Sequence, residues 1–299
     1  MHPIERLRYV ARSGGDPAEI AGEAVAALSA LAADPRALLI ACRRLLDAHP
    51  ECGPLWWAAA RLICSSEPAL AADEVEERLI DDPTADELAA ALPAGAVVAA
   101  VPSPSILRAL ACRPDVRVRL VGAPRQLRAT RRALGDGPAE VKAYPPERCG
   151  AALAGSTLVL IEALAAGTRA ALAAAPNRSL ASAAWTPSGR EPSARNKKGV
   201  GASGVPVWLV LPEGRVLPLP LFEACTRRAL APPLERPEVL RPYDGWSSAV
   251  DAARIASEVE LLDVDRMALA ITPDGPARPE VALAAASCPS PAELTKGAA

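Results

Sequence analysis

One acidic residue stands at the end of an apolar run in the middle of the chain. The run covers Thr157 to Ile161 and reads as a buried strand, and Glu162 follows it directly. Ligands of open α/β sheets bind beyond the carboxyl ends of the strands, so a carboxylate at this point could contact a ligand or exchange a proton with it. The helix dipole alone would equally favour a carboxylate in the first turn of a following helix. Gly167 and Thr168 come soon afterwards and could complete an anion pocket.

Two hydroxyl groups follow an earlier predicted strand in the same way. Ser103 and Ser105 come after the apolar run Ala96 to Val101, at the start of a predicted helix. Hydroxyls and free amides at a helix N-terminus suit a phosphate group. Serine is also preferred at that position as an ordinary helix cap, so both interpretations stay open.

The next predicted strand is followed by glycine and arginine. Gly122 comes after the strand Val116 to Val121, and Arg125 lies at the start of a helix that carries further arginines at 128, 131 and 132. An arginine in this place could clamp a phosphate. Most of these side chains are expected to form a solvated helix face.

Common catalytic and cofactor-binding motifs are missing from the sequence. No GxGxxG follows the first predicted strand, and no P-loop, GxSxG or HExxH occurs. The only histidines are His2 and His49, at the terminus and at a helix end, which argues against a histidine base and a zinc hydrolase. The seven cysteines include no CxxC pair, so neither a structural zinc site nor a disulfide framework is expected. We therefore predict no metal and no cofactor.

The composition indicates a protein with a large apolar core and little net charge. The 299 residues are 51% hydrophobic and carry a net charge of −2, so neither nucleic acid nor an anionic membrane is an expected partner. No apolar signal segment or membrane-spanning run occurs. Reduced cysteines fit the cytoplasm, where we expect the protein to reside.

The spacing of apolar residues divides the chain in two. Residues 1–92 show helical stripes, and Asp16-Pro17 and Asp34-Pro35 are typical helix starts. From residue 93 onward, short apolar runs alternate with helical stretches, which predicts a parallel, doubly wound sheet. The fold class is therefore α/β, with a helical N-terminal domain (1–92) followed by a Rossmann-like, mostly parallel sheet domain (93–299).

Several segments of the second domain carry specific expectations. A helix is predicted over roughly 163–175, and two strands are predicted within Val259 to Ile271. Residues 177–204 are rich in Ser, Gly, Pro and charge and read as a flexible insertion, either a tolerated surface loop or a lid over a ligand. Residues 232–248 form a second irregular stretch.

Taken together, several segments resemble the translation initiation factor 2B alpha/beta/delta-related family, and in particular an actinobacterial branch of it. They are HPIERLRYVARSGG, ALLIACRRLLDAHPECGPLWWAAARL, STLVLIEALAAG, GVPVWLV and CPSPAEL. The resemblance implies a sheet domain of the NagB/RpiA/CoA-transferase-like type. The family includes regulatory subunits of eukaryotic initiation factor 2B. It also includes aldose–ketose isomerases that act on methylthioribose 1-phosphate and ribose 1,5-bisphosphate.

The resemblance also implies where the catalytic groups of an isomerase would lie. The family's isomerases carry a cysteine in the loop after the first sheet strand, where this chain reads Pro102-Ser103-Pro104-Ser105. They carry an aspartate in a Gly-Ala-Asp motif that falls here on Glu162-Ala163-Leu164. Without both groups, the transfer of a proton between C1 and C2 of the sugar has no obvious catalyst. Glu162 is then at most a displaced acid or a ligand contact.

Three functions remain open on this basis. The favoured one is a non-catalytic binding or regulatory protein, homodimeric by resemblance, that binds a phosphorylated sugar or nucleotide. Its pocket would be lined by Ser103, Ser105, Gly122, Arg125, Glu162, Gly167 and Thr168. The alternative is an aldose–ketose isomerase with Glu162 as its acid–base group. An RNA-binding or translation module is a third possibility, suggested by the arginines between 113 and 132, but the net charge and scarce aromatic residues argue against it.

Overall fold

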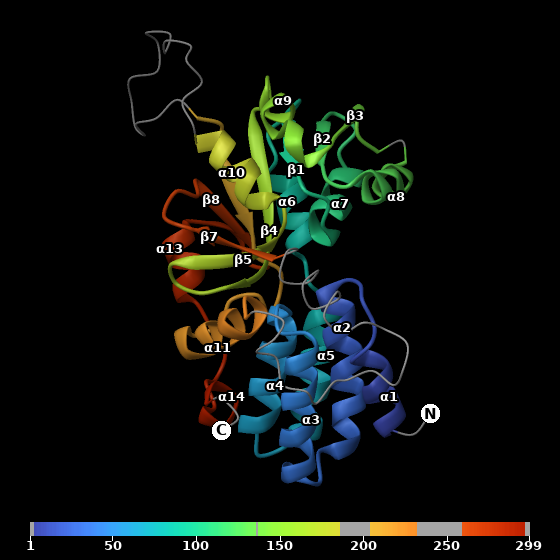
Figure 1. Ribbon diagram of the computed structural model, residues 1–299, viewed down its shortest axis with the longest axis vertical. Helices are drawn as coiled ribbons and strands as arrows, with labels where there is room; N and C mark the ends of the chain where they lie inside the picture. Colours follow the sequence, from blue (N-terminus) through green and yellow to red (C-terminus); the bar gives the residue numbers. More distant parts are fainter. Residues whose placement is uncertain (1–2, 136, 186–203, 232–258, 297–299) are drawn as a thin grey trace.

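The computed structural model describes residues 3–135, 137–185, 204–231 and 259–296 (Figure 1). Its first part is helical, as predicted. The two predicted helix starts are confirmed, because Asp16 accepts a hydrogen bond from the amide of Ala18 and Asp34 accepts from those of Arg36 and Ala37. The helices of this part are α1 (Pro3–Val10), α2 (Pro17–Leu28), α3 (Pro35–Ala48), α4 (Gly53–Cys64), α5 (Pro68–Ile80) and α6 (Thr84–Ala91).

The second part is built on a sheet whose main path runs in the order β3-β2-β1-β4-β6-β8-β9. All neighbours on this path are parallel except β8 and β9. The predicted α/β class and mostly parallel sheet are therefore confirmed. The strands are β1 (Val97–Ala100), β2 (Arg117–Val121), β3 (Glu140–Tyr144), β4 (Leu158–Ala166), β6 (Val207–Val210), β8 (Leu269–Thr272) and β9 (Gly275–Ala277).

Helices cover both faces of the sheet, which explains why the central strands β1 and β6 are apolar throughout. On one face, Val98 and Leu160 pack against α6, α7 (Pro104–Ala111) and α8 (Pro124–Leu134). On the other face, Ala99 and Val159 pack against α9 (Cys149–Leu153), α10 (Asn177–Trp185) and α13 (Pro279–Ala284).

The helix expected over 163–175 is wrong. Strand β4 continues through Ala166, and the chain turns back as β5 (Ala170–Ala174), which pairs antiparallel with β4 and with β7 (Val259–Asp263). Alanine favours a helix in isolation, but its intrinsic preference is a weak guide where tertiary contacts decide. Here the buried alanines supply the small surface that lets the neighbouring elements approach.

The first part of the insertion predicted over 177–204 is wrong, because it is helical. Residues 177–185 form helix α10, whose Leu180 and Ala184 are buried against the sheet. Residues 186–203 and 232–248 lie outside the described part of the chain. The two strands predicted between 259 and 271 are confirmed as β7 and β8.

The helical part and the sheet part share one apolar core. Leu55 of α4 and Leu28 of α2 belong to the same cluster as Ala165 and Leu172 of the β4–β5 hairpin. The contact is close, because a Cβ added to Gly53 would lie 2.4 Å from the carbonyl oxygen of Leu164. Helix α6 packs on the sheet part, against α7, β8 and β9. The boundary expected near residue 92 stays a prediction.

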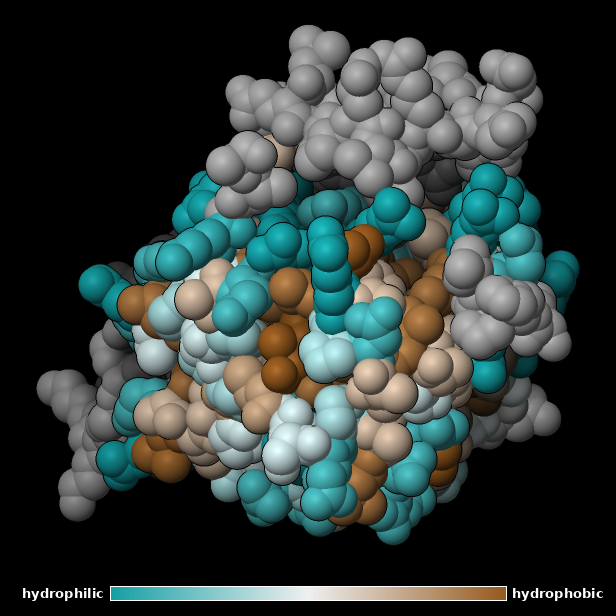
Figure 2. All heavy atoms as spheres, turned by 90° about the horizontal axis from the view of Figure 1, so that it is seen from below, coloured by the Kyte–Doolittle hydropathy of each residue, from teal (hydrophilic) through white to brown (hydrophobic). Residues whose placement is uncertain are grey.

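The C-terminal helices return to the helical part. Helices α11 (Leu219–Ala229) and α14 (Ala292–Thr295) lie beside α3 and α4 (Figure 1). Arg43 fixes this return, since its Nε and Nη2 donate to the carbonyl of Glu293 at 3.0 and 2.7 Å. On the face of the molecule seen in Figure 2, hydrophobic side chains lie in small groups between hydrophilic ones. Among the described residues no helix is long and apolar enough to cross a membrane.

Candidate functional site

Glu162 lies on strand β4, level with Val210 of β6, and only 6% of it is exposed. Its side chain leaves the sheet on the same side as those of Leu158 and Leu160, toward α7. Its Oε2 accepts hydrogen bonds from the amides of Ser105 at 3.0 Å and Ile106 at 3.4 Å. The carboxylate therefore caps the N-terminus of helix α7, the positive end of its dipole, where the first amides have no intrahelical partners.

A buried arginine completes the cluster. After β6 the chain runs beside the extended end of β4, and the amide of Ala166 donates to the carbonyl of Arg215 at 2.7 Å. This places Nη2 of Arg215 at 3.4 Å from Oε1 of Glu162 and Nη1 at 3.3 Å from the carbonyl oxygen of Leu164. Arg215 is 1% exposed, and its Nε has no hydrogen-bond partner in the described part of the chain. We call Glu162, Arg215 and the two amides of α7 the Glu162 cluster.

The environment of Glu162 raises the pKa of its carboxyl group. Burial is the largest cause, and the positive charge of Arg215 acts against it, as do the Ser103 hydroxyl and the Ser105 amide. Desolvation therefore outweighs the attraction of the buried guanidinium. A carboxyl group in this state could carry a proton, but its two oxygens are already engaged by the chain's own donors.

The structure brings both predicted serines to Glu162. Ser105 contributes its backbone amide, and its side chain is buried. Ser103 is the N-cap residue of α7 but makes no side-chain capping bond. Its hydroxyl acts on Glu162, whose pKa it lowers, but makes no hydrogen bond of normal geometry. The phosphate site expected at this helix start is thus filled by a carboxylate of the protein itself.

Gly122 and Arg125 lie at the neighbouring strand end. The amide of Gly122 donates to the carbonyl of Tyr144 at 3.1 Å, and a Cβ there would lie 3.6 Å from Cδ of Pro102 and 2.9 Å from Oε1 of Gln126. Arg125 is exposed in the first turn of α8. These two residues are next to the Glu162 cluster but outside its hydrogen bonds.

Gly167 and Thr168 lie elsewhere, in the turn between β4 and β5. The amide of Gly167 donates to the carbonyl of Ala170 at 2.9 Å, and a Cβ on Gly167 would lie 2.5 Å from Cδ1 of Phe222. Thr168 is exposed. At about 3.3 Å per residue, the turn is roughly 16 Å along the strand from Glu162. The structure therefore does not bring these residues to the Glu162 carboxylate, and an anion pocket around them stays a prediction.

Sequence reasoning overlooked Arg215. A signal was present, because Arg215 comes four residues after the apolar run VWLVL, while Glu162 directly follows LVLI. In a parallel sheet the carboxyl ends of both strands meet at one edge. On this ground the sequence could have predicted that Glu162 pairs with Arg215.

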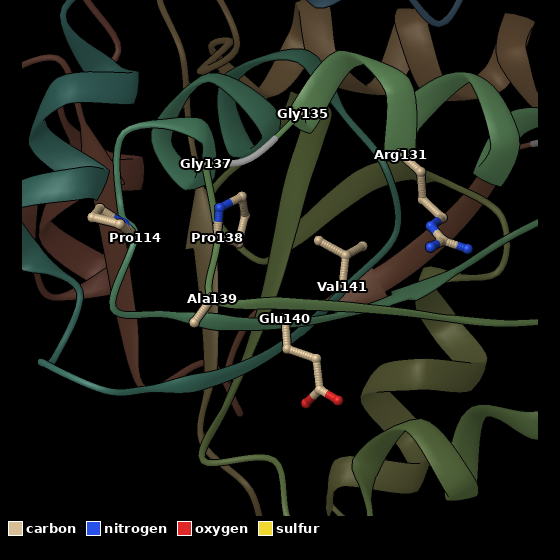
Figure 3. A pocket seen from close by; sticks show the side chains of 8 residues that line it. All are labelled: Pro114, Arg131, Gly135, Gly137, Pro138, Ala139, Glu140 and Val141. Atoms are coloured by element: carbon tan, nitrogen blue, oxygen red, sulfur yellow. The ribbon is translucent and has the colours of Figure 1, made fainter.

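A pocket of about 460 Å³ lies at the other end of the strands (Figure 3). It is next to the start of β3, and in Figure 3 the carboxylate of Glu140 points away from the glycine loop above it. This pocket is separate from the Glu162 cluster. It is lined by Pro114, Arg131, Gly135, Gly137, Pro138, Ala139, Glu140 and Val141.

The described residues hold neither a group of metal ligands nor a disulfide. Within the described ranges, no three His, Cys, Asp or Glu residues are grouped so that they could hold a metal ion. All seven cysteines are free thiols. Burial raises the pKa of Cys52, which lies near Arg215, to about 12, so its thiol stays protonated at neutral pH and is a poor nucleophile.

Solved structures share this fold. The translation initiation factor eIF-2B of Pyrococcus horikoshii OT3 superimposes with a TM-score of 0.67 at 14% identity, over 94% of this chain and 98% of that one. A chain of the tetrameric eIF2B-beta2-delta2 complex from Chaetomium thermophilum gives 0.62 at 16% identity, over 94% and 93%. The 5-methylthioribose 1-phosphate isomerase of Pyrococcus horikoshii OT3 gives 0.55 at 12% identity, over 93% and 85%. No family model and no curated protein matches the sequence.

Proposed function

We propose that this chain is an initiation factor 2B-like protein that binds or regulates rather than catalyses. The fold is shared with initiation factor subunits and with an isomerase, so the fold alone does not choose between these functions. The choice rests on the site. By resemblance, an isomerase of this kind would need a cysteine and an aspartate. The matching loop, Pro102-Ser103-Pro104-Ser105, holds no cysteine, and Leu164 stands at the position of the aspartate.

The observation that carries this proposal is the engagement of Glu162. Its two oxygens are held by the amides of Ser105 and Ile106 and by Arg215, in a place with almost no solvent exposure. A general base must reach the proton that it removes, within hydrogen-bond distance of the substrate. A carboxylate that already closes a helix end would have to abandon these contacts first.

The activity test uses the substrate of the isomerase with the same fold. Purified protein and its Glu162→Gln variant are incubated with 5-methylthioribose 1-phosphate, and the aldose and ketose are followed by NMR. We expect no conversion above the rate without protein in either sample. Turnover by the unmodified protein would overturn the proposal.

For the ligand, we propose a phosphorylated sugar or nucleotide. The start of α7 is already neutralised by Glu162, so the phosphate is expected at the exposed start of α8, beside Gly122 and Arg125.

Thermal unfolding is measured with a panel of sugar phosphates and nucleoside monophosphates. A ligand at about 100 times its dissociation constant adds roughly 2.7 kcal/mol of stability. The shift should be lost in Arg125→Ala and kept in Arg36→Ala, an exposed arginine on α3. No shift with any compound would refute the ligand but leave the non-catalytic assignment standing.

One observation favours the alternative, an aldose–ketose isomerase. The raised pKa of Glu162 is a property that acid–base catalysts share. This alternative requires conversion of a phosphorylated aldose by the unmodified protein and its loss in Glu162→Gln. The activity test above therefore decides between the two functions.

Assembly and location complete the proposal. A neighbour of the same fold forms a tetrameric complex, and we propose that this chain forms a homodimer. The free thiols agree with a reducing compartment, which supports the cytoplasm.

A further inference from the structure

The small net charge of the chain hides two strongly charged segments. Residues 67–87 contain nine acidic residues and one arginine, whereas residues 105–132 contain eight arginines and one aspartate. The acidic segment covers α5 and the start of α6, and the basic segment covers α7, β2 and most of α8. Both signs are normally interspersed on a protein surface. Their segregation on two elements is the feature to be explained.

The outward face of α5 combines acidic and apolar side chains. Leu70 and Ile80 are 53% and 69% exposed, and the exposed Asp73 and Glu77 lie between them at helical spacing. The opposite side of α5 packs into the core through Ala72 and Val75. Neither Asp73 nor Glu77 has an ion-pair partner in the part of the chain that the structure describes. We call Leu70, Asp73, Glu77 and Ile80 the acidic face.

The outward face of α8 is its electrostatic counterpart. Arg128 and Arg132 are four residues apart, as Asp73 and Glu77 are, with the small Ala129 between them, and all three are exposed. Leu127 and Leu134 form the buried side. No acidic residue occurs on α8, and within the described ranges its arginines form no ion pair. We call Arg128, Ala129 and Arg132 the basic face; it leaves the start of α8, with Arg125, uncovered.

We infer that the basic face of one copy of this chain docks on the acidic face of a second copy. The two faces carry opposite charges at the same helical spacing, on helices of 13 and 11 residues. Leu70 and Ile80 would be covered by Ala129 and by the aliphatic stems of the arginines. Helices α5 and α8 lie in different parts of the molecule (Figure 1), so the faces do not meet within one chain.

The same charges argue against nucleic acid as the occupant of the basic face. The acidic face of the same molecule would repel phosphates, and α8 has no aromatic side chain on which a base could stack. A twofold arrangement satisfies both faces of both copies at once and closes the assembly as a dimer. This inference rests on the homodimer proposed above. A monomeric protein would refute both, whereas reversed variants that stay dimeric would refute the docking alone. The inference is independent of the non-catalytic assignment and of the proposed ligand.

The experiment is sedimentation velocity on the full chain and on charge-reversed variants. At low salt we expect a dimer, and raising the salt to about 0.5 M should weaken it about tenfold or more, since such contacts are strongly screened. The double variants Arg128→Glu/Arg132→Glu and Asp73→Arg/Glu77→Arg should each be monomeric. An equimolar mixture of the two should form a dimer, because each reversed face then meets a face of opposite charge.

Two controls protect the interpretation. Arg36→Glu/Arg44→Glu makes the same change of charge on the exposed side of α3 and should leave the dimer intact. Far-UV circular dichroism checks that each variant is folded, and Arg128→Ala/Arg132→Ala replaces the reversed pair if it is not. A monomeric unmodified protein at low salt, reversed variants that remain dimeric, or a mixture that stays monomeric would each overturn the inference.

Discussion

Two neighbouring strand–helix units, β1–α7 and β2–α8, handle charge in opposite ways. Helix α7 begins in the interior, where Glu162 accepts from its amides and Arg215 balances the carboxylate. Helix α8 begins at the surface, where its N-cap residue Ala123 makes no side-chain bond. In sequence the two starts are similar, since Pro104 and Pro124 each open the helix. The difference comes from residues distant in sequence. Glu162 and Arg215 bind the start of α7 from within the chain, whereas the start of α8 stays accessible to a partner.

The largest expected loss of stability comes from removing the buried carboxylate of Glu162. In Glu162→Ala the guanidinium of Arg215 and the first amides of α7 lose their partner while they remain buried. Breaking a buried ion pair from one side costs about 3–5 kcal/mol. Urea unfolding should show a loss of this size.

The control for that variant is Glu147→Ala, which removes an exposed carboxylate beside α9. Such surface changes usually stay within about 0.5 kcal/mol. A loss below about 1 kcal/mol in Glu162→Ala would mean that water reaches Arg215, and the α7 unit would then be as open as α8.

The second prediction concerns pH. Because burial raises the pKa of Glu162 in the folded chain, the folded protein keeps a proton that the unfolded chain releases near pH 4.3. As pH rises from that value through the raised pKa, the contribution of Glu162 to the free energy of unfolding falls, and above the raised pKa it is constant. Each unit of difference between the two pKa values is worth about 1.4 kcal/mol.

The neutral variant Glu162→Gln isolates this effect. Free energies of unfolding of both proteins are measured at several values from pH 4 to pH 8, and the difference between them is plotted. We expect the unmodified protein to lose stability relative to Glu162→Gln as pH rises. A relative gain would mean that Arg215 outweighs burial and lowers the pKa of Glu162.

The third prediction sharpens the comparison by giving α8 the cap that it lacks. Ala123 has φ −65° and ψ 145°, the extended backbone of an N-cap residue. In Ala123→Ser the new hydroxyl can accept from an amide of the first turn, which should add about 1 kcal/mol of stability. Ala129→Ser, in the middle of the same helix, should instead lower stability by about 0.5 kcal/mol. Equal effects at both positions would show that capping is not the cause.

How far the sequence predicts this arrangement depends on the range of the contacts. The apolar run 157–161 predicted the first part of strand β4, but the strand continues through Ala166 and Glu162 lies within it. The hairpin that follows was not predicted, because Ala170–Ala174 is a strand only through its pairing with β4 and with Val259–Asp263. The pairing of Glu162 with Arg215 likewise depends on how the chain runs after β6. Local preference carries none of that information.

The smallest predicted effect tests whether the N-cap of α7 matters once Glu162 is present. Ser103 occupies the cap position, but its Oγ makes no capping bond and acts on Glu162 without a hydrogen bond of normal geometry. Its removal in Ser103→Ala should therefore change the free energy of unfolding by no more than about 0.5 kcal/mol, whereas loss of a working cap costs about 1 kcal/mol. Chemical denaturation of Ser103→Ala beside Ala123→Ser makes the contrast direct. A loss near 1 kcal/mol in Ser103→Ala would show that the hydroxyl shares the work of Glu162, and α7 would then be closed by two groups instead of one.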